Sequence, residues 1–290
     1  MQKTVAEEKR KHSSKIIPFS YYECRIPDYF ANVPLHWHGE FELNYIRSGC
    51  SEFICGDERL LAQAGDVILL TPNTLHAIYP YENNTQTYDT LVFHPSMLGL
   101  EDNDRCAAEY IRPIVNGSLG VQMHIRKDCA QYAVIKELVE EMIICAKDNS
   151  AQADLLLKSN LLRMLWMLEK NGGIYRNREE DVKRSELIRP ALEYMNQNYC
   201  DSITVEQLAN ITHLSKSYFM DRFKQAAGVG AVEYIIQLRI KKACELLLDT
   251  ERTTAEIAFE CGFKNLSNYN RQFKRIMGCT PNAYRKENRF

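Results

Sequence analysis

The chain contains 290 residues, 45% of them hydrophobic and 26% charged, which is typical of a soluble globular protein with about two domains. The net charge is −2 but is unevenly spread: from Arg184 onward there are 16 Lys and Arg against 12 Asp and Glu, whereas the first 183 residues carry 20 against 26. Because there is no run of 18 apolar residues and no apolar N-terminal core, we expect neither a membrane span nor a signal peptide, and we predict a cytoplasmic protein.

The first half of the chain is predicted to be rich in β-strands. Residues 1–15 are polar and charged, and we expect a flexible leader there. Beyond them, Pro and Gly residues separate short apolar segments up to about residue 94. This pattern predicts a β-sandwich or small barrel, with strands that include Glu42–Ile46, Glu52–Cys55, Asp66–Leu70 and Thr87–Phe93.

A cluster of histidines and a carboxylate lies within this β-region. His36, His38, Glu42 and Asn44 are separated by even numbers of residues, so they face one side if they lie on a regular strand. Together with His76, they offer three imidazoles and one carboxylate, a set that suits an Fe, Mn, Ni or Zn ion. Two other interpretations stay open: the residues line a metal-free ligand pocket, or they hold strands together by hydrogen bonds.

The predicted pocket also includes an aromatic ring and a planar hydrogen-bonding group, which suit a sugar or another small polar metabolite. The candidate ligand-binding residues are Arg25, His36, His38, Glu42, Asn44, His76 and Tyr79. Four of them resemble the two motifs of the cupin superfamily, whose enzymes use the matching residues to hold a metal. The resemblance implies metal ligands at His36, His38, Glu42 and His76. Cupin sensor domains of transcription regulators carry a similar pattern without metal, so a divalent metal is a candidate cofactor and not a required one.

Two amphipathic helices are predicted after the β-region, over residues 128–148, with Asp128 as the N-cap, and over 153–171. The apolar face of the second helix is wider than one contact with the barrel needs, which favours a homodimer through these helices. The alternative is that both helices only cover the barrel. Asn171, Gly172 and Gly173 are typical of a helix end, and the charged residues 174–186 are the predicted linker. The first domain is therefore expected over 16–173 and the second over 187–290.

The second domain carries one pattern twice, with corresponding positions 49 or 50 residues apart. The repeated pairs are Ala209 and Ala258, Leu214 and Phe263, Phe223 and Phe273, Gly228 and Gly278, and Tyr234 and Tyr284. Each copy reads as a short helix, a turn and a second helix, the layout of a helix-turn-helix that enters the major groove of DNA. The predicted helices are Val205–Ile211 capped by Thr204, Lys216–Ala226 capped by Ser215, Ala231–Asp249, Ala255–Cys261 capped by Thr254, Leu266–Met277 capped by Asn265, and a last helix from Pro281.

The segments Ala255–Phe263, Asn270–Lys274 and Gly278–Pro281 resemble the AraC/XylS family of transcription regulators, and the resemblance extends over nearly the whole chain. It implies base contacts by Ser217, Tyr218, Met220, Asp221, Leu266, Ser267, Asn268 and Arg271. Lys274, on the same predicted helix as Arg271, is expected to reach a DNA phosphate. Arg271 is suited to a guanine and Asn268 to an adenine. His213 stands at a turn position where Gly is frequent in the family.

These observations predict an α+β protein of two domains, a cupin-like barrel with dimerisation helices and an all-α domain with two helix-turn-helix motifs. We expect a transcription regulator and not an enzyme, with a small-molecule effector in the cupin domain. The expected partners are double-stranded DNA, the effector, a second copy of the chain and, as a further candidate, RNA polymerase, but no membrane. Two alternatives are a metal-dependent cupin enzyme fused to a DNA-binding tail, and a constitutive DNA-binding protein whose barrel is a scaffold.

Overall fold

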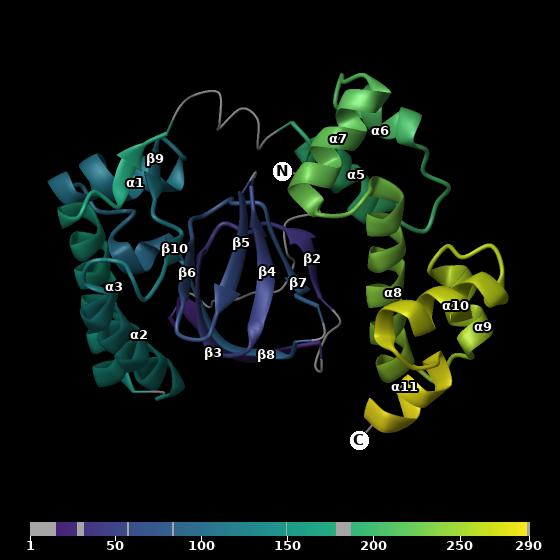
Figure 1. Ribbon diagram of the computed structural model, residues 1–290, viewed down its shortest axis with the longest axis horizontal. Helices are drawn as coiled ribbons and strands as arrows, with labels where there is room; N and C mark the ends of the chain where they lie inside the picture. Colours follow the sequence, from purple (N-terminus) through teal and green to yellow (C-terminus); the bar gives the residue numbers. More distant parts are fainter. Residues whose placement is uncertain are drawn as a thin grey trace. The chain divides into compact units, whose positions relative to one another are not determined.

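The computed structural model describes residues 16–27, 32–56, 58–82, 84–148, 150–177 and 187–288. They form two compact units, one built mainly from residues before 187 and the other from residue 187 onward (Figure 1). The predicted leader, residues 1–15, lies outside the described residues. Among the residues described, no helix has the length and apolar character needed to cross a membrane.

The first unit is a β-barrel of antiparallel strands. Its described strands form a five-stranded sheet in the order β1-β8-β3-β6-β10, a four-stranded sheet in the order β2-β7-β4-β5, and a small β11-β9 pair. The strands are β1 Phe19–Ile26, β2 Val33–His36, β3 Phe41–Ser48, β4 Cys50–Cys55, β5 Glu58–Gln63, β6 Val67–Leu70, β7 His76–Pro80, β8 Gln86–Phe93, β9 Leu119–Val121, β10 His124–Ile125 and β11 Ile174–Arg176. The four strands predicted from the sequence are present as β3, β4, β6 and β8.

Strand β3 shows how the barrel separates its two faces. Phe41, Leu43 and Tyr45 lie in the apolar core on the outer face of the sheet, which also contains buried residues of the following helices. Glu42 and Asn44 alternate with them and face the barrel interior, where both are buried. The strand therefore carries core packing on one face and a polar site on the other.

Helices cover the outer face of the five-stranded sheet (Figure 1). A 3-10 helix, a π-helical turn and three α-helices follow the strands: Pro95–Leu98, Ala107–Ile111, α1 Arg112–Val115, α2 Tyr132–Lys147 and α3 Ala151–Lys170. The predicted cap of α2 at Asp128 is wrong. Gln131, in the left-handed region at φ 66°, precedes α2 instead, because a residue with this backbone cannot continue a right-handed helix. Ser150, which was not predicted, caps α3. Gly172 at φ 73° follows the end of α3, as the sequence indicated.

The first unit also extends beyond the boundary expected from the sequence. Residues 174–176, the start of the predicted linker, form β11 and pair with β9. The charge of Arg176 is compatible with this strand because the residue is exposed. The rest of the predicted linker, from residue 178, lies outside the described residues.

The second unit consists of α5 Arg189–Asn198, α6 Val205–Ile211, α7 Lys216–Ala227, α8 Ala231–Asp249, α9 Thr254–Glu260, α10 Leu266–Met277 and α11 Pro281–Asn288. Helix pairs α6–α7 and α9–α10 are the two copies of the sequence repeat. They have matching lengths, and α7 and α10 end at Gly228 and Gly278 with nearly the same backbone, φ 72° and 74°. Ala209 and Ala258 are buried in the two copies. The sequence repeat is therefore a structural repeat.

The helix starts follow from local capping. Thr204 and Gln207 form a reciprocal capping box at α6, as predicted. In the second copy the predicted cap, Thr254, is wrong by one residue. Thr253 is the cap, because its side chain accepts from the backbone N–H of Glu256 while the Glu256 carboxylate accepts from the Thr253 N–H.

Candidate functional site

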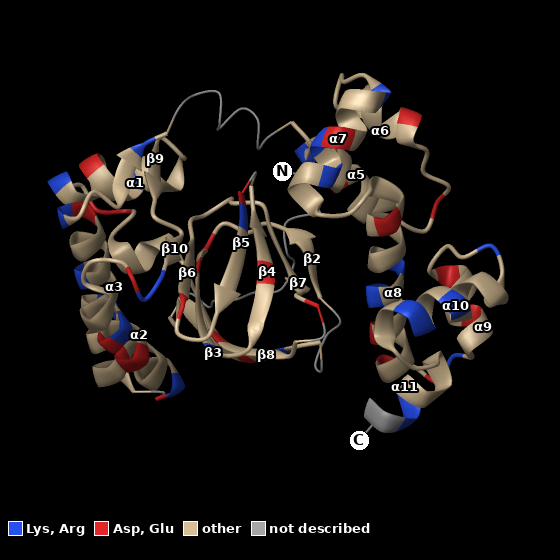
Figure 2. Ribbon diagram, viewed as in Figure 1, with Lys and Arg blue, Asp and Glu red and all other residues tan. Residues whose placement is uncertain are grey.

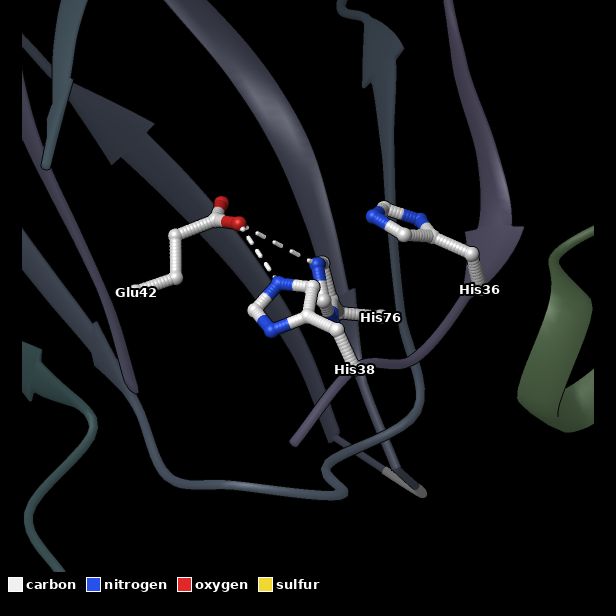
Figure 3. A group of neighbouring side chains, drawn as sticks. All are labelled: His36, His38, Glu42 and His76. Atoms are coloured by element: carbon white, nitrogen blue, oxygen red, sulfur yellow. Dashed lines mark hydrogen bonds and ion pairs between the residues drawn. The ribbon is translucent and has the colours of Figure 1, made fainter. Parts of the chain in front are cut away.

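Four side chains meet inside the barrel. His36 ends β2, His38 lies between β2 and β3, Glu42 is on β3 and His76 begins β7. One ligand atom from each residue lies within 4.8 Å of the others. Figure 3 shows the Glu42 carboxylate pointing at His38 and His76, with His36 on the far side of the group. The predicted set therefore comes together, although His36 and Glu42 lie on different strands and not on the single regular strand that the spacing suggested.

The carboxylate of Glu42 is the centre of the contacts. Its Oε2 atom is 3.1 Å from Nε2 of His38 and 3.5 Å from Nε2 of His76. Burial raises the pKa of Glu42, but the imidazoles of His76 and His38 lower it more, so its pKa lies well below the usual value. Glu42 is thus a buried anion facing imidazole nitrogens.

Two of the imidazoles are oriented by backbone carbonyls. Nδ1 of His36 lies 2.9 Å from the Pro34 carbonyl oxygen, and Nδ1 of His76 lies 2.9 Å from that of Thr74. Because a carbonyl only accepts, Nδ1 carries the proton in both contacts, and in the neutral ring Nε2 then presents a lone pair. For His76 that lone pair faces a carboxylate oxygen of Glu42. Two acceptors in this arrangement require a proton or a cation between them.

The donor set fits a divalent metal. Imidazole nitrogen and carboxylate oxygen suit Fe, Mn, Ni and Zn, and ligand histidines usually donate their other ring N–H to a carbonyl or carboxylate, as His36 and His76 do here. Opposed ligands at about 2.1 Å from an ion are roughly 4.2 Å apart. The 4.8 Å spread of this group is slightly larger, so small side-chain movements would close it around an ion.

A hydrogen-bonded chain behind Glu42 fixes its orientation. Asn44 Nδ2 donates to the second carboxylate oxygen of Glu42 at 2.8 Å, and Thr90 Oγ1 donates to Asn44 Oδ1 at 2.6 Å. Asn44 was a predicted pocket residue, whereas Thr90 was missed. The predicted strand Thr87–Phe93 could have placed Thr90 on the same face as Tyr88. It could not have placed Thr90 opposite Asn44, because the pairing register of β3 and β8 is not visible in the sequence.

Arg25 and Tyr79 were predicted to line the pocket, but neither side chain lies in this group. Arg25 is exposed on β1, on the face opposite that of its neighbour Cys24, whose thiol lies 3.6 Å from Thr90 inside the barrel. Tyr79 stands three residues after His76 on β7, and this odd separation places it on the outer face of the four-stranded sheet.

The second unit presents the predicted DNA-reading residues on α7 and α10. Most of them are exposed: Ser217, Tyr218, Met220, Asp221, Ser267, Arg271 and Lys274. Leu266 and Asn268 are half-buried, and Leu266 also packs against the apolar core of the second copy. Arg271 donates to the Asn268 side-chain oxygen at 3.0 Å, so the two residues predicted to read bases are paired with each other in the DNA-free chain.

Lys and Arg residues are prominent on α10 (Figure 2). They are not equivalent, because Arg275 forms an ion pair with Glu233 of α8, with its Nη2 atom 2.6 Å from Oε1 and 2.9 Å from Oε2. In the first copy, Lys216 at the start of α7 is paired with Glu206 of α6. The other two cations of α10, Arg271 and Lys274, do not take part in this ion pair.

Comparisons with known proteins agree with both units. A family described as an AraC-like ligand binding domain matches residues 19–165, half of the chain, and a helix-turn-helix domain family matches residues 208–287. The HTH-type transcriptional regulator YdiP of Escherichia coli K12, itself described as uncharacterized, is 26% identical over 87% of this chain and 80% of its own length. The raffinose operon transcriptional regulatory protein RafR of Pediococcus pentosaceus is 24% identical, covering 85% of this chain and 84% of that protein. The structure of ToxT from Vibrio cholerae superposes with a TM-score of 0.47 at 15% identity, over 93% of this chain and 98% of that one.

Proposed function

The chain belongs to the AraC family of transcription regulators, and we propose that a small polar metabolite bound at His36, His38, Glu42 and His76 controls how it binds DNA. The observation that carries this proposal is the convergence of these side chains inside the barrel. Imidazole and carboxylate groups are donors and acceptors for hydroxyl groups, so the ligand class that fits is a sugar or a similar polyol. The relative named for a raffinose operon supports the same class.

The effector acts by shifting a population. A ligand changes DNA affinity only if it binds the DNA-competent and DNA-incompetent arrangements with different affinity. The family relatives are named as regulators, which supports binding and not catalysis as the task of the barrel. A regulator that activates transcription also contacts RNA polymerase, and this partner stays a prediction for the chain.

We expect a sugar to stabilise the wild-type chain against heat and to lose this effect when the histidine cluster is broken. A ligand at 100 times its dissociation constant adds about 2.7 kcal/mol of stability, which raises the melting temperature by several degrees. The measurement is a thermal-shift screen of raffinose, melibiose, lactose and their component sugars on wild type and His76→Ala.

Tyr79→Phe is the matched control, because Tyr79 lies on the same strand but on the outer face. It should respond as wild type does. A panel in which no sugar shifts the wild type, or in which His76→Ala responds equally, contradicts the proposed pocket.

A divalent metal at the same residues is the second candidate, favoured by the facing lone pair of His76 and carboxylate of Glu42. In that case His36, His38, Glu42 and His76 hold the ion, which supplies a positive centre for ligand oxygens. Titration of the chelator-treated chain with Ni, Zn, Mn and Fe salts in the same screen separates the two candidates. A metal response without a sugar response assigns the pocket to the ion.

We further propose a homodimer through α2 and α3. Leu155, Leu162 and Trp166 share one face of α3 and are exposed to 72%, 37% and 58%. An exposed apolar face on a helix that already packs in the core on its other side marks an interaction surface.

Leu162→Glu should therefore raise the dimer dissociation constant by at least about tenfold, because it places a charge in an apolar interface. The measurement is sedimentation velocity across a concentration series. Leu61→Glu is the control, since Leu61 is 38% exposed on β5 of the four-stranded sheet, whereas the helices cover the five-stranded sheet. Unchanged dimerisation of Leu162→Glu contradicts this interface.

A further inference from the structure

An open groove of about 540 Å³ lies between α9, α10 and α11 in the second helix-turn-helix copy. It is lined by two apolar residues, Leu266 and Pro281, and by six polar ones: Thr254, Asn270, Arg271, Lys274, Thr280 and Asn282. Two of the polar side chains are cationic and the other four are hydroxyls or amides, so the groove offers positive charge and several hydrogen-bond donors beside its apolar lining. That is the chemistry that recognises a phosphodiester oxygen.

Both cations of the groove are available to DNA: Lys274 is the one assigned to a phosphate, and Arg271 is the predicted reader of a base edge. Arg271 is held by an amide oxygen of Asn268 and not by a carboxylate. Among the described residues Lys274 is exposed and forms no ion pair, whereas its neighbour Arg275 is paired with Glu233. Helix α11 also begins at the groove, where Thr280 accepts from the Ala283 N–H, and a helix start favours an anion.

The first copy lacks this chemistry at the corresponding positions. The structural repeat aligns the two copies with an offset of 49 residues at the first helix and 50 from the second helix onward. Apart from the lysine, each polar or basic groove residue is replaced by an apolar residue, a glycine or an acid. The pairs are Thr254 and Val205, Asn270 and Met220, Arg271 and Asp221, Lys274 and Lys224, Thr280 and Gly230, and Asn282 and Val232.

The first-copy surface that corresponds to the groove is exposed and largely apolar. Met220 is 42% and Val232 is 60% exposed, and the acidic Asp221 lies beside Met220 on α7. A phosphate at this surface would meet two apolar side chains and a negative charge. Lys224 alone does not reproduce the groove.

We propose that the groove of the second copy is a DNA-phosphate site that anchors the chain on its operator, and that the first copy has no such site. The inference rests on the DNA-binding function of the family and adds to it an unequal division of labour. The second copy supplies most of the salt-dependent affinity, because neutralising a phosphate releases counterions. The half of the operator under the first copy is held more loosely and is read through Tyr218, Met220 and Asp221.

The test compares the two lysines at equivalent positions. Wild type, Lys274→Ala and Lys224→Ala of the full chain are titrated by fluorescence anisotropy with a duplex that the wild-type chain selects from a random-sequence library, at salt concentrations of about 50–200 mM. Lys274→Ala should weaken binding about tenfold and reduce the slope of log K against log salt by about one. Lys224→Ala should leave the slope unchanged. Equal changes in the two variants, or none in Lys274→Ala, overturn the proposal.

A second pair of variants tests the groove without removing a charge. Asn270→Met with Asn282→Val gives the second copy the first copy's residues at two groove positions, and should also weaken binding several-fold. Val232→Asn makes the reverse exchange at one position of the first copy, outside its reading residues, and should not weaken binding. Circular dichroism melting checks that each variant folds, and weaker binding by the reverse exchange alone contradicts the proposal. If the wild-type chain selects no sequence from the library, the DNA-binding function itself is contradicted and not merely the groove.

Discussion

Replacing Arg271 with alanine should reduce the affinity for the selected operator by about 1–3 kcal/mol, which is roughly 5- to 150-fold. Arg271 is exposed on α10, and its guanidinium can make the paired hydrogen bonds that distinguish guanine in the major groove. Because it also orients the Asn268 amide, its loss should relax the sequence preference at one base position and weaken it at a second. The measurement is operator affinity together with repeated sequence selection by the variant.

Arg275→Ala is the matched control for this prediction. Arg275 lies on the same helix and is about half exposed, but it is paired with Glu233 of α8. Its replacement should leave every base preference intact. If Arg271→Ala keeps the wild-type affinity and preference, α10 is not the reading helix that its sequence suggests.

Replacing Gly262 with alanine should destabilise the second helix-turn-helix copy by about 3 kcal/mol. Gly262 has φ 84°, and a Cβ atom placed on it would lie 2.3 Å from the backbone carbonyl oxygen of Cys200. A backbone atom cannot move away as the end of a flexible side chain can. The backbone strain and the overlap therefore add. The equivalent turn residue of the first copy, His213, also has a positive φ of 55° but carries a side chain.

Gly278→Ala separates the two contributions. Gly278 has φ 74°, but a Cβ atom there would meet nothing within 4 Å, so only the backbone strain of about 1–2 kcal/mol remains. Urea unfolding followed by circular dichroism reports the helices. The chain's two tryptophans, Trp37 and Trp166, both lie in the first unit, so tryptophan fluorescence reports that unit separately. Equal destabilisation by the two substitutions would show that the backbone at Cys200 moves away from the added Cβ atom at little cost in free energy.

The helical unit could be predicted from the sequence almost residue by residue because its signals are local. A capping residue and its partner are three positions apart, as in Thr204 and Gln207, and each copy ends in a glycine. The shifted start at Thr253 occurred where two threonines are adjacent. The position of Glu256 three residues after Thr253 is the signal that distinguishes them.

The barrel site could be predicted only in part, because it depends on pairing between distant strands. The residues of the cluster were identified correctly, but a single regular strand from His36 to Asn44 was the wrong reason. The chain bends between β2 and β3, and His36 and Glu42 meet across the barrel interior. Tyr79 could have been excluded by its odd separation from His76. The hydrogen bond from Thr90 to Asn44 depends on the pairing register of β3 and β8, which only the structure provides.

We propose above that the pocket around Glu42 and His76 controls DNA binding. The most direct measurement is the operator affinity of wild type and His76→Ala, each with and without the sugar that stabilises the wild-type chain. We expect the sugar to change the wild-type affinity by at least about fivefold and to leave the affinity of the variant unchanged. A sugar that binds the wild type without changing its DNA affinity, or that changes the affinity of both proteins equally, contradicts control of DNA binding by this pocket.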